Sequence, residues 1–428
     1  MIKVLHLSTF HLAGGAGIAA ARLNRALNKN GVRSGLLVAK TTVDEPNVSV
    51  LNDSVPGKFF FWLRFIAERL FFLPYERSPE VRYSFSPAVS GKDLTRHRLV
   101  KEADIIHLHW VNFGFLSIGD IGRLLSLGKP VVWTLHDMWA FTGGCHHSGE
   151  CDHFMSSCGN CKFLKRPGEK DLSYGRLLLK KQLWKPGKGF KAVACSRWLG
   201  HRAQSGSLWQ PSDVISIPNP LDTSLFRRVE NFNQYAGLGL SAGKTYILFA
   251  AAKVSAKGKG FGFLHEALRI LARKKPEAGQ KLGLLILGAD DGGALDDIPL
   301  EARFLGYIGS DEMLVKVYNA ASLYVTPSVE DNLPNTVMEA MACGTPVVGF
   351  RTGGIPEMID HKVNGYVADY KSPESLAEGI LWVLENNTGG ALSEAARQKV
   401  LREYDEKVVA ARYHELYKSL LSGCKDPV

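Results

Sequence analysis

The chain has 428 residues, of which 45% are hydrophobic and 22% are charged, a composition typical of an ordinary globular protein that argues against a disordered one. This length allows two domains with sizeable cores. No apolar run reaches the roughly 18 to 20 residues that a transmembrane helix needs. The N-terminal run MIKVLHLSTF lacks the longer apolar core and the cleavage site of a signal peptide, so we expect a cytoplasmic protein.

Apolar, strand-like runs alternate with helical stretches, which is the pattern of parallel sheets covered on both faces. We expect an α/β protein with two doubly wound, Rossmann-like domains facing a cleft. The first comprises residues 1–218 and the second residues 219–404, which begin with a polar interdomain linker at 219–244. A C-terminal helix at about 405–428 should pack back on the first domain. The predicted strands are 3–7, 35–38, 105–107, 131–135, 192–194, 214–217, 246–250, 283–287, 322–325 and 346–350.

A glycine-rich turn, HLAGGAGIAAARLNRAL, follows the first predicted strand. Gly14 and Gly15 let the backbone pass close to a ligand, and the helix after them offers amides to an anion. Ligands of such sheets bind outside the carboxyl ends of the strands, where this turn lies. Any tight strand-to-helix turn would use the same glycines, so the turn alone does not identify a site.

The segment 57–77, GKFFFWLRFIAERLFFLPYER, is crowded with aromatic residues but broken by charged ones, so it cannot span a bilayer. On a helix its charged residues fall within an arc of about 140°, which some of the aromatic residues also enter. The helix is either buried in the N-terminal core, or it lies at a membrane interface or forms a groove for a lipid acceptor. The candidate contacts for the second interpretation are Phe60, Trp62 and Arg64.

A histidine and four cysteines follow the predicted strand 131–135. His136 is a candidate catalytic residue at a strand end, where a purely structural histidine is equally common. The cysteines are spaced C-x5-C-x6-C-x2-C, and in a cytosolic enzyme such cysteines are more often metal ligands than disulfides. We expect a structural zinc site, with reduced packed thiols or a disulfide as the alternatives. The four residues are Cys145, Cys151, Cys158 and Cys161.

Ten basic residues and two acidic ones lie between Lys162 and Lys191, which concentrates the net charge of +10. Such a stretch is either a solvated face or a contact surface for lipid headgroups, a pyrophosphate or nucleic acid. Aromatic residues interleave with the lysines, but no nucleic-acid-binding signature accompanies them. We therefore expect a membrane surface as partner, with Lys180 and Lys181 among the contacts.

In the second half, the stretch AAAKVSAKGKGF follows a predicted strand. Its lysines suit a diphosphate as compact point charges, although solvated lysines would look the same. We select Lys253 and Lys259 as the candidates for this contact.

The stretch VTPSVEDNLPNTVMEAMACGTPVV predicts a strand, a polar turn, a helix and another strand. Asp331 or Asn332 would cap this helix, but capping does not explain Glu339, an acid within an apolar run. The amides of Asn335 and Thr336 stand at the helix start and can hold phosphate oxygens, while Glu339 can accept hydrogen bonds from vicinal hydroxyls. The common ligand of these groups is a sugar nucleotide.

The run EAMACGTPVV at 339–348, together with FRTGGIPEMIDHKVNGYVADY and SIPNPLD, resembles the retaining glycosyltransferases of family 4, which have the GT-B fold. The resemblance covers essentially the whole chain. It implies that Glu339 binds the ribose hydroxyls, that the Asn335 and Thr336 amides hold the diphosphate, and that Lys253 and Lys259 neutralise it. It also implies that His136 lies beside the donor sugar and the acceptor, with Gly14 and Gly15 near the phosphates.

The stretch TLHDMWAFTGGCHHSGECDHFMSSCGNC resembles the colanic-acid-type branch, which builds bacterial surface polysaccharides on a lipid carrier. Two positions depart from the family pattern. Asp331 stands eight residues before Glu339, where the family has glutamate, and Glu330 precedes it. An arginine and lysine pair of the family is replaced by lysines with one residue more between them.

The sequence therefore predicts a GT-B enzyme, peripheral on the cytoplasmic membrane face, that moves a sugar with retention from a nucleoside diphosphate donor to a lipid-linked or oligosaccharide acceptor. Its catalytic residues would be His136, Asp331 and Glu339, and transfer would need no cofactor. The rival functions are a sugar phosphorylase or sugar-phosphate synthase with a soluble acceptor, a non-catalytic sugar-nucleotide sensor, and a nucleic-acid-binding protein.

Overall fold

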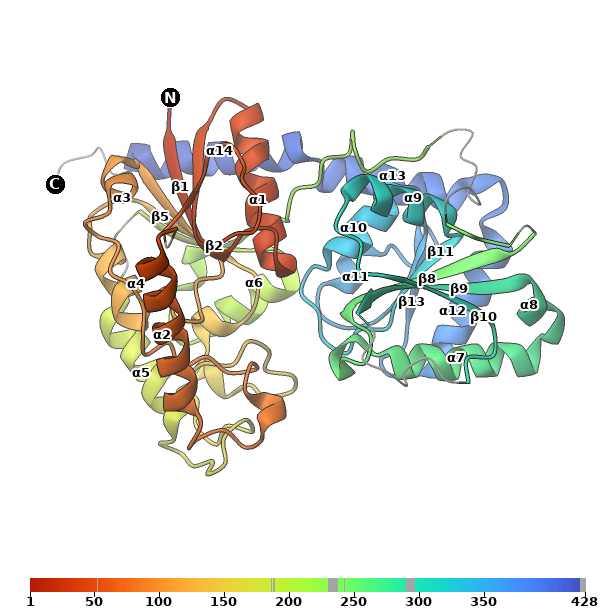
Figure 1. Cartoon of the computed structure of the whole chain (residues 1–428), viewed down its shortest axis with the longest axis horizontal. Helices are drawn as coiled ribbons and strands as arrows, with labels where there is room; N and C mark the ends of the chain where they lie inside the picture. The colour runs from red at the N-terminus through yellow and green to blue at the C-terminus, as the bar shows by residue number, and fades with distance from the viewer. Residues whose placement is uncertain are drawn as a thin grey trace. The chain divides into compact units, whose positions relative to one another are not determined.

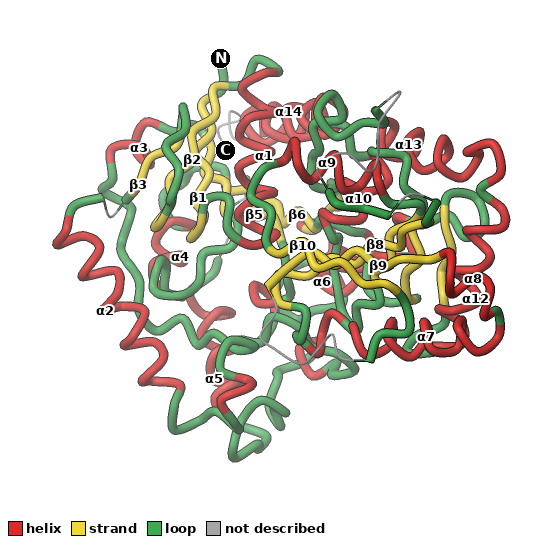
Figure 2. Tube along the Cα trace, turned by 45° about the vertical axis from the view of Figure 1, so that its right-hand side comes forward, coloured by secondary structure: helices red, strands yellow, loops and turns green. Residues whose placement is uncertain are grey.

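The computed structural model describes residues 1–51, 53–185, 187, 189–229, 238–241, 243–289 and 297–423. The chain forms two compact units, Met1–Asn219 with Val409–Val428, and Pro220–Val408. Each unit is a parallel sheet with helices packed against it (Figures 1 and 2), so the predicted fold class is confirmed. Part of the predicted linker, and the C-terminal end including Cys424, lie outside the described residues.

The described strands of the first unit form one seven-stranded parallel sheet in the order β3-β2-β1-β4-β5-β6-β7. The strands are β1 (Lys3–Phe10), β2 (Arg33–Lys40), β3 (Val48–Val50), β4 (Ile105–Leu108), β5 (Val131–Leu135), β6 (Phe190–Ala194) and β7 (Val214–Ser216). The helices are α1 (Gly14–Lys29), α2 (Val55–Phe72), α3 (Arg98–Glu102), α4 (Ile118–Leu125), α5 (Leu172–Leu183), α6 (Arg197–Gln204) and α14 (Glu406–Gly423), which begins in the second unit.

Alternate residues of each strand bury on opposite faces of this sheet, as the pleat requires. Val4, Ile105, Val132 and Val193 pack against α1 and against Val409, Ala410, Tyr413 and Tyr417 of α14. Their neighbours Leu5, Ile106, Trp133 and Ala192 belong to the larger core on the other face, with α4 and α6. Both faces are covered, which explains why the strands appear in the sequence as continuous apolar runs.

The described strands of the second unit form a six-stranded parallel sheet in the order β10-β9-β8-β11-β12-β13. The strands are β8 (Thr245–Lys253), β9 (Leu282–Ala289), β10 (Glu301–Gly306), β11 (Leu323–Thr326), β12 (Val347–Phe350) and β13 (Gly365–Ala368). The helices are α7 (Phe261–Lys274), α8 (Pro276–Lys281), α9 (Asp311–Ala320), α10 (Asn335–Ala342), α11 (Ile355–Met358), α12 (Pro373–Asn386) and α13 (Ala391–Glu403). Figure 1 shows α7 and α12 on one side of this sheet and α9, α10 and α13 on the other.

Three observed strands were not expected from the sequence: β3, β10 and β13. β3 and β10 are edge strands, and most of β10 is exposed, so neither carries a buried apolar run. β13 is buried but has only four residues, GYVA, which is too short for a clear pattern. None of the described helices combines the length and the hydropathy that crossing a bilayer requires.

Candidate functional site

The second unit has its strand switch between β8 and β11. The chain proceeds outward from β8 to β9 and β10, and then returns to place β11 on the other side of β8. In open α/β sheets a ligand crevice lies at such a switch, beyond the carboxyl ends of the strands. Lys253 is the last residue of β8 and is exposed, and the turn Lys257–Lys259 follows it.

The loops after β8 and β11 bring Lys259 and Asp331 together. Lys259 Nζ lies 2.7 Å from Asp331 Oδ2, which also accepts a hydrogen bond from the Ser328 hydroxyl at 3.3 Å. Gly260 has a φ of +71°, and a Cβ there would lie 1.9 Å from the Pro327 carbonyl oxygen. The two loops therefore meet backbone to backbone, and only glycine fits at the point of contact.

Helix α10 presents Glu339 to the interior of the second unit. The Glu339 side chain is buried, and its Oε2 accepts a hydrogen bond of 2.8 Å from the Tyr318 hydroxyl of α9. Burial, with the Glu339 charge beside it, raises the pKa of Tyr318 well above its ordinary value, so this hydroxyl stays a donor. The carboxylate thus has a structural partner, which satisfies part of the need of a buried charge.

The first turn of α10 carries the predicted phosphate-binding amides. The helix begins at Asn335 with Pro334 in the N-cap position and no side-chain capping bond, so the expectation that Asp331 or Asn332 caps it is wrong. The Thr336 hydroxyl accepts a hydrogen bond of 2.9 Å from the Tyr324 hydroxyl of β11. The start of the helix is therefore tied to the strand whose carboxyl end carries the Asp331 loop.

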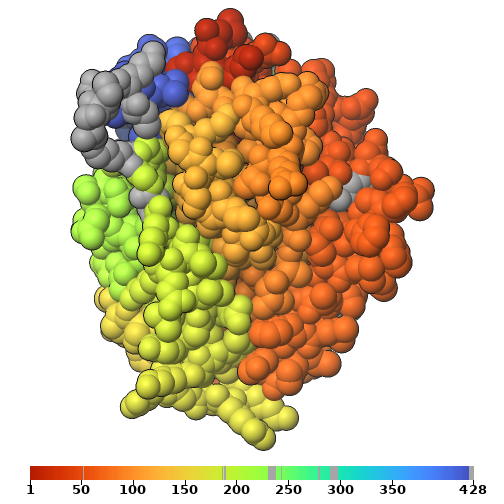
Figure 3. Space-filling model, turned by 90° about the vertical axis from the view of Figure 1, so that its left-hand side faces the viewer, coloured from red at the N-terminus to blue at the C-terminus, as the bar shows by residue number. Residues whose placement is uncertain are grey.

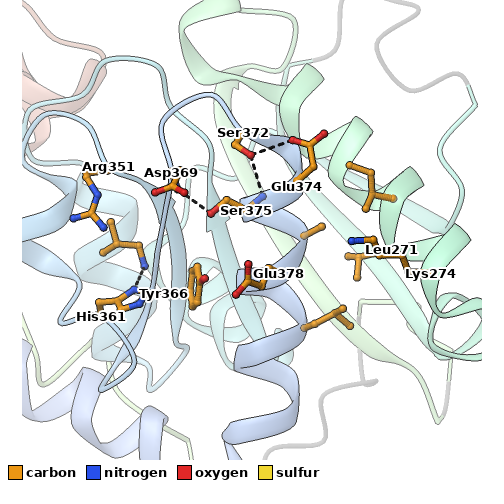
Figure 4. A pocket seen from close by; sticks show the side chains of 14 residues that line it. Leu271, Lys274, Arg351, His361, Tyr366, Asp369, Ser372, Glu374, Ser375 and Glu378 are labelled. Carbon is orange, nitrogen blue, oxygen red and sulfur yellow. Dashed lines mark hydrogen bonds between the residues drawn. The ribbon is translucent and has the colours of Figure 1, made fainter.

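Two cavities of the second unit differ in their relation to this switch. One of about 660 Å³ lies between α7, α12 and the end of β13, where Figure 4 shows Arg351 and His361 opposite Glu374 and Glu378. None of the predicted donor-binding residues is among those that line it. The other, of about 570 Å³, is lined by residues 254–257 and by the start of α7, beside the lysine turn. The predicted donor-binding residues do not line this second cavity either, although Lys257, from the turn after β8, does.

The first unit has its strand switch between β1 and β4. Gly14 begins α1 with a φ of +68°, and a Cβ at Gly17 would lie 3.0 Å from the Phe10 carbonyl oxygen, so the helix starts tightly against the end of β1. Gly15 lies in the first turn, and no side chain caps the helix. The glycine-rich turn is thus positioned as expected, at the carboxyl edge of the sheet.

His136 follows β5 and contacts two side chains through its ring. Its Nε2 lies 3.1 Å from His109 Nδ1, and its Nδ1 lies 3.6 Å from Cys195 Sγ. His109 Nε2 in turn lies 2.8 Å from His6 Nδ1. The sequence interpretation singled out His136 but missed the buried His6, His107 and His109. The available signal was the His-Leu-His spacing, which places His107 and His109 on one face of a strand.

Asp137, next to His136, is a structural acid. Its Oδ2 lies 2.6 Å from His146 Nδ1 and accepts a hydrogen bond of 2.8 Å from Trp110 Nε1. Its Oδ1 accepts a hydrogen bond of 2.8 Å from the Trp139 amide. Burial favours its neutral form, but the charge and hydrogen bond of His146 outweigh burial and hold the pKa of Asp137 at about 2. These bonds fix the loop that begins at His136.

The four clustered cysteines lie near one another as thiols, and no disulfide joins any of the six described cysteines. Burial and the neighbouring thiols raise the pKa of Cys145 and Cys158 to about 12 and that of Cys161 to about 11, and two others of the four cysteines contribute to each of these shifts. The Gly143 amide donates to Cys158 Sγ at 3.2 Å. Among the described residues, no three of these sulfur atoms lie within 4.8 Å of one another.

Helix α2 buries the ion pair Glu68–Arg69 and exposes several of its large apolar side chains, although Phe72 is buried and Lys58 is exposed. Glu68 and Arg69 are buried as an ion pair of 2.6 Å, and Arg64 is half-buried, with its Nε donating to the Gly114 carbonyl oxygen at 3.1 Å. Phe60 and Trp62, by contrast, are 56% and 54% exposed. The other large apolar side chains exposed on or just beyond the helix are Val55, Phe59, Leu63, Leu70, Leu73 and Tyr75. We call this set, with Phe60 and Trp62, the α2 patch.

The basic stretch lies beside α2, but not every lysine of the stretch is exposed at the surface as we expected. Figure 3 shows α2 and α5 on one face of the first unit, and the Arg176 guanidinium lies 5.4 Å from the Phe71 ring centre. Lys181 is half-buried and donates to the Ser156 carbonyl oxygen at 2.8 Å. Lys180 is fully buried, 3.8 Å above the Trp139 ring, and burial lowers its pKa to about 7, so its expected surface role is wrong. Lys188 lies outside the described residues.

These observations define a class of protein that has two parallel α/β units, each with a strand switch. At the switch of the second unit lie lysines and the N-terminus of helix α10. Residues 13–225 match the family model described as Glycosyltransferase Family 4, and residues 244–386 match the one described as Glycosyl transferases group 1. Together these matches span most of the chain, which therefore belongs to the glycosyltransferases with these two domains.

Individual proteins agree with this assignment. The chain is 26% identical over 378 residues to a D-inositol 3-phosphate glycosyltransferase of Segniliparus rotundus, covering 85% of this chain and 75% of the relative. WaaG, a glycosyltransferase involved in lipopolysaccharide biosynthesis, has a similar structure, with a TM-score of 0.64, 15% identity and coverage of 97% and 99%. Anabaena Alr3699/HepE in complex with UDP-glucose has a TM-score of 0.61, 17% identity and coverage of 98% and 100%.

Proposed function

We propose that this glycosyltransferase uses a nucleoside diphosphate sugar and transfers the sugar with retention at the anomeric carbon. The observation that carries the proposal is the strand switch of the second unit, where Lys259, the start of α10 and the buried Glu339 occupy neighbouring elements. A diphosphate needs cations and amides, and a ribose needs a carboxylate acceptor. The similarity to a protein whose structure contains UDP-glucose supports the same ligand class.

The chemistry follows from these groups. Lys253, Lys259 and the first amides of α10 would stabilise the negative charge that grows on the departing diphosphate, which is the largest contribution that such a site makes to the rate. The acceptor hydroxyl would attack the anomeric carbon from the face that the diphosphate leaves, and its proton would pass to the departing diphosphate oxygen as the bond from that oxygen to the sugar breaks. Asp331, which Lys259 already contacts, would orient that lysine and share it with the phosphate. No resident metal or cofactor is part of this scheme.

The test separates the two roles of Glu339. Thermal stability is measured with a panel of nucleoside diphosphate sugars, for which a ligand at 100 times its dissociation constant should stabilise by roughly 2.7 kcal/mol. Glu339→Gln should abolish both the shift and donor hydrolysis. Tyr318→Phe is the matched control, because it removes the hydroxyl that donates a hydrogen bond to Glu339 and leaves the Glu339 carboxylate in place. If both variants still bind the donor as the wild type does, Glu339 is a structural acid and not a ribose ligand.

The acceptor that we propose is lipid-linked, or an oligosaccharide, in bacterial surface polysaccharide synthesis, with the protein peripheral on the cytoplasmic membrane face. The α2 patch supports a membrane contact, because rings that protrude from a surface bury apolar area only when another phase covers them. Lys162, Lys165, Arg166 and Lys170 are exposed and suit anionic headgroups. The Lys165 amide donates to the Tyr75 carbonyl oxygen at 2.7 Å, which joins the two surfaces.

A second candidate acceptor is a soluble phosphorylated polyol. It is favoured by the Segniliparus relative, whose name gives inositol 3-phosphate as its acceptor. A soluble acceptor leaves the α2 patch without a use. Transfer assays with inositol 3-phosphate and with lipid-linked acceptors in vesicles, run side by side with the donor found above, decide between the two.

We also propose structural zinc at Cys145, Cys151, Cys158 and Cys161. Cys145, Cys158 and Cys161 each lie close enough to two others of the four for those thiols to affect its pKa, so the group can close around one ion. An amide that donates to sulfur is typical of the surroundings of a thiolate ligand. Zinc–sulfur bonds of about 2.3 Å would require the sulfur atoms to draw closer together than they now lie. The ion would order the loop between β5 and α5 and would take no part in transfer.

A further inference from the structure

A row of four imidazoles crosses the first unit beneath the switch between β1 and β4. His6 lies within β1 and pairs in register with His107 of β4, while His109 follows β4 and His136 follows β5. His6, His107 and His109 are all buried. The neighbouring ring centres are 4.4 Å apart for His107 and His109 and 5.4 Å apart for His109 and His136. We call His6, His109 and His136 the imidazole chain.

The distances in this row indicate shared protons and not a metal ion. The ligand atoms of His6, His107 and His109 lie within 4.8 Å of one another, which alone would allow an ion. However, His6 Nδ1 and His109 Nε2 are only 2.8 Å apart, whereas two nitrogens at about 2.0–2.1 Å from one tetrahedral zinc would stand about 3.3 Å apart. His107 already uses both nitrogens, on the hydroxyls of Thr134 and Tyr417, each at 2.7 Å.

Counting protons leaves two arrangements for the imidazole chain. Burial lowers the pKa of His6 to about 3 and that of His136 to about 4, and it lowers the pKa of His109 well below the ordinary value, so the rings are neutral at pH 7. A neutral imidazole has one N–H and one acceptor nitrogen. Because each of the two contacts holds one proton, all three rings carry it on Nδ1 or all three carry it on Nε2.

The two ends of the chain select between these arrangements. Cys195 is buried, and its thiol donates to the Leu135 carbonyl oxygen at 3.2 Å or to Asn219 Oδ1 at 3.0 Å, so its sulfur faces His136 Nδ1 as an acceptor. At the other end, His6 Nε2 is buried without a hydrogen-bond partner. A buried N–H without a partner is rarer than an unpaired acceptor. Both ends therefore favour protons on Nδ1.

We propose that Cys195, His109 and His6 are positioning residues that hold His136 as the neutral Nδ1–H tautomer, with its ring orientation fixed. The proposal rests on the proposed function only in giving His136 the place beside the donor sugar and the acceptor that the resemblance to family 4 implies. Since His136 Nε2 already accepts from His109, neither ring nitrogen is available to take a proton from an acceptor hydroxyl. His136 thus contributes shape and a fixed dipole at the site, and it is not a general base.

The experiment is ¹⁵N NMR of the full chain labelled at histidine side chains. Long-range ¹H–¹⁵N correlations report the tautomer of each ring, and couplings between ¹⁵N nuclei report the two N–H···N contacts. We expect Nδ1–H for the three rings of the chain, both couplings, and no change in these signals on adding zinc chloride. Nε2–H at His136, absent couplings or zinc-dependent shifts at His6 and His109 would each overturn the proposal.

Variants distinguish positioning from general structural support. Cys195→Ala removes the acceptor of the His136 proton and should shift His136 toward Nε2–H. The matched control is His107→Leu, which removes an equally buried ring that stacks on His109 but lies outside the chain. If the control shifts the His136 tautomer as much as Cys195→Ala does, the effect is structural. The spectra need no activity, so a protein with the expected tautomers and no transferase activity refutes the proposed function alone.

Discussion

The buried histidines should make the first unit sensitive to mild acid. His6, His107, His109 and His136 are neutral when folded, because burial lowers the pKa of each, to about 3 for His6 and about 4 for His136. In the unfolded chain they bind protons below about pH 6.5. Stability from this source is therefore fully present above pH 6.5 and is lost as the pH falls toward 4.

The size of the loss follows from linkage. When the pH falls from 7 to 5.5, each ring that stays neutral in the folded state lowers the free energy of unfolding by about 1 kcal/mol. The four rings together lower it by about 4 to 5 kcal/mol. This is a large share of the 5 to 15 kcal/mol that folded domains commonly have. Asp137 acts on His136 in the opposite direction, and the buried Glu68, whose pKa is raised, also opposes the trend. This range of pH largely avoids the titration of the other carboxylates.

The assay is urea unfolding at pH 7 and pH 5.5, followed by tryptophan fluorescence. Seven of the eight tryptophans lie within Met1–Asn219, so the signal reports mainly the first unit. His6→Leu should reduce the pH-dependent loss by about 1 kcal/mol, one ring's share. His201→Leu, which removes an exposed imidazole of α6, should leave it unchanged. A wild-type protein equally stable at both pH values would refute the neutral buried row.

Three further outcomes test the other proposals. Lys259→Met should weaken donor binding about tenfold or more, since a hydrogen bond to a charged group is worth about 1.5–3 kcal/mol, and calorimetry measures the change. Trp62→Ser should weaken binding to anionic vesicles by about 2 kcal/mol, calculated at 25 cal/mol per Å² of buried apolar area, and should not destabilise the protein. The control is Tyr307→Ser, which removes a ring that is 79% exposed in the second unit and should not alter binding. Cys145→Ser with Cys158→Ser should abolish zinc binding measured by elemental analysis, while Cys343→Ser should retain it.

The sequence predicts the sheets because both of their faces are covered. A strand such as Val131–Leu135 is buried at every position, so it appears as a continuous apolar run that alternates with helical stretches. The edge strand Glu301–Gly306 is mostly exposed and carries no such run, so the sequence does not reveal it. The edge strands therefore escape prediction because their exposed residues need not be apolar, whereas the buried β13 escapes it because it has only four residues.

The candidate site shows the same division. Lys259 and Asp331 are 72 residues apart, but each follows a strand, so the strand-switch rule predicts that both lie at one edge of the sheet, where their side chains are 2.7 Å apart. His6 gave no comparable signal, and the His-Leu-His spacing of His107 and His109 indicates one face of a strand but not which strand lies beside it in the sheet. The prediction that Lys180 lies at the surface is wrong for the opposite reason. Its place in a basic stretch predicted exposure, while its amine packs on the Trp139 ring inside the unit.

Helix α2 is the element whose arrangement folding alone explains least. Its buried pair, Glu68 and Arg69, is supported by a hydrogen bond from the Gly114 amide at 3.2 Å and by one to the Arg82 carbonyl oxygen at 2.6 Å. Replacing a buried ion pair with apolar residues is often neutral or stabilising, and replacing exposed rings with polar residues costs little. A simpler helix would therefore fold at least as well in water. The protein keeps this ion pair inside and the side chains of the α2 patch outside, an arrangement that favours contact with an apolar phase.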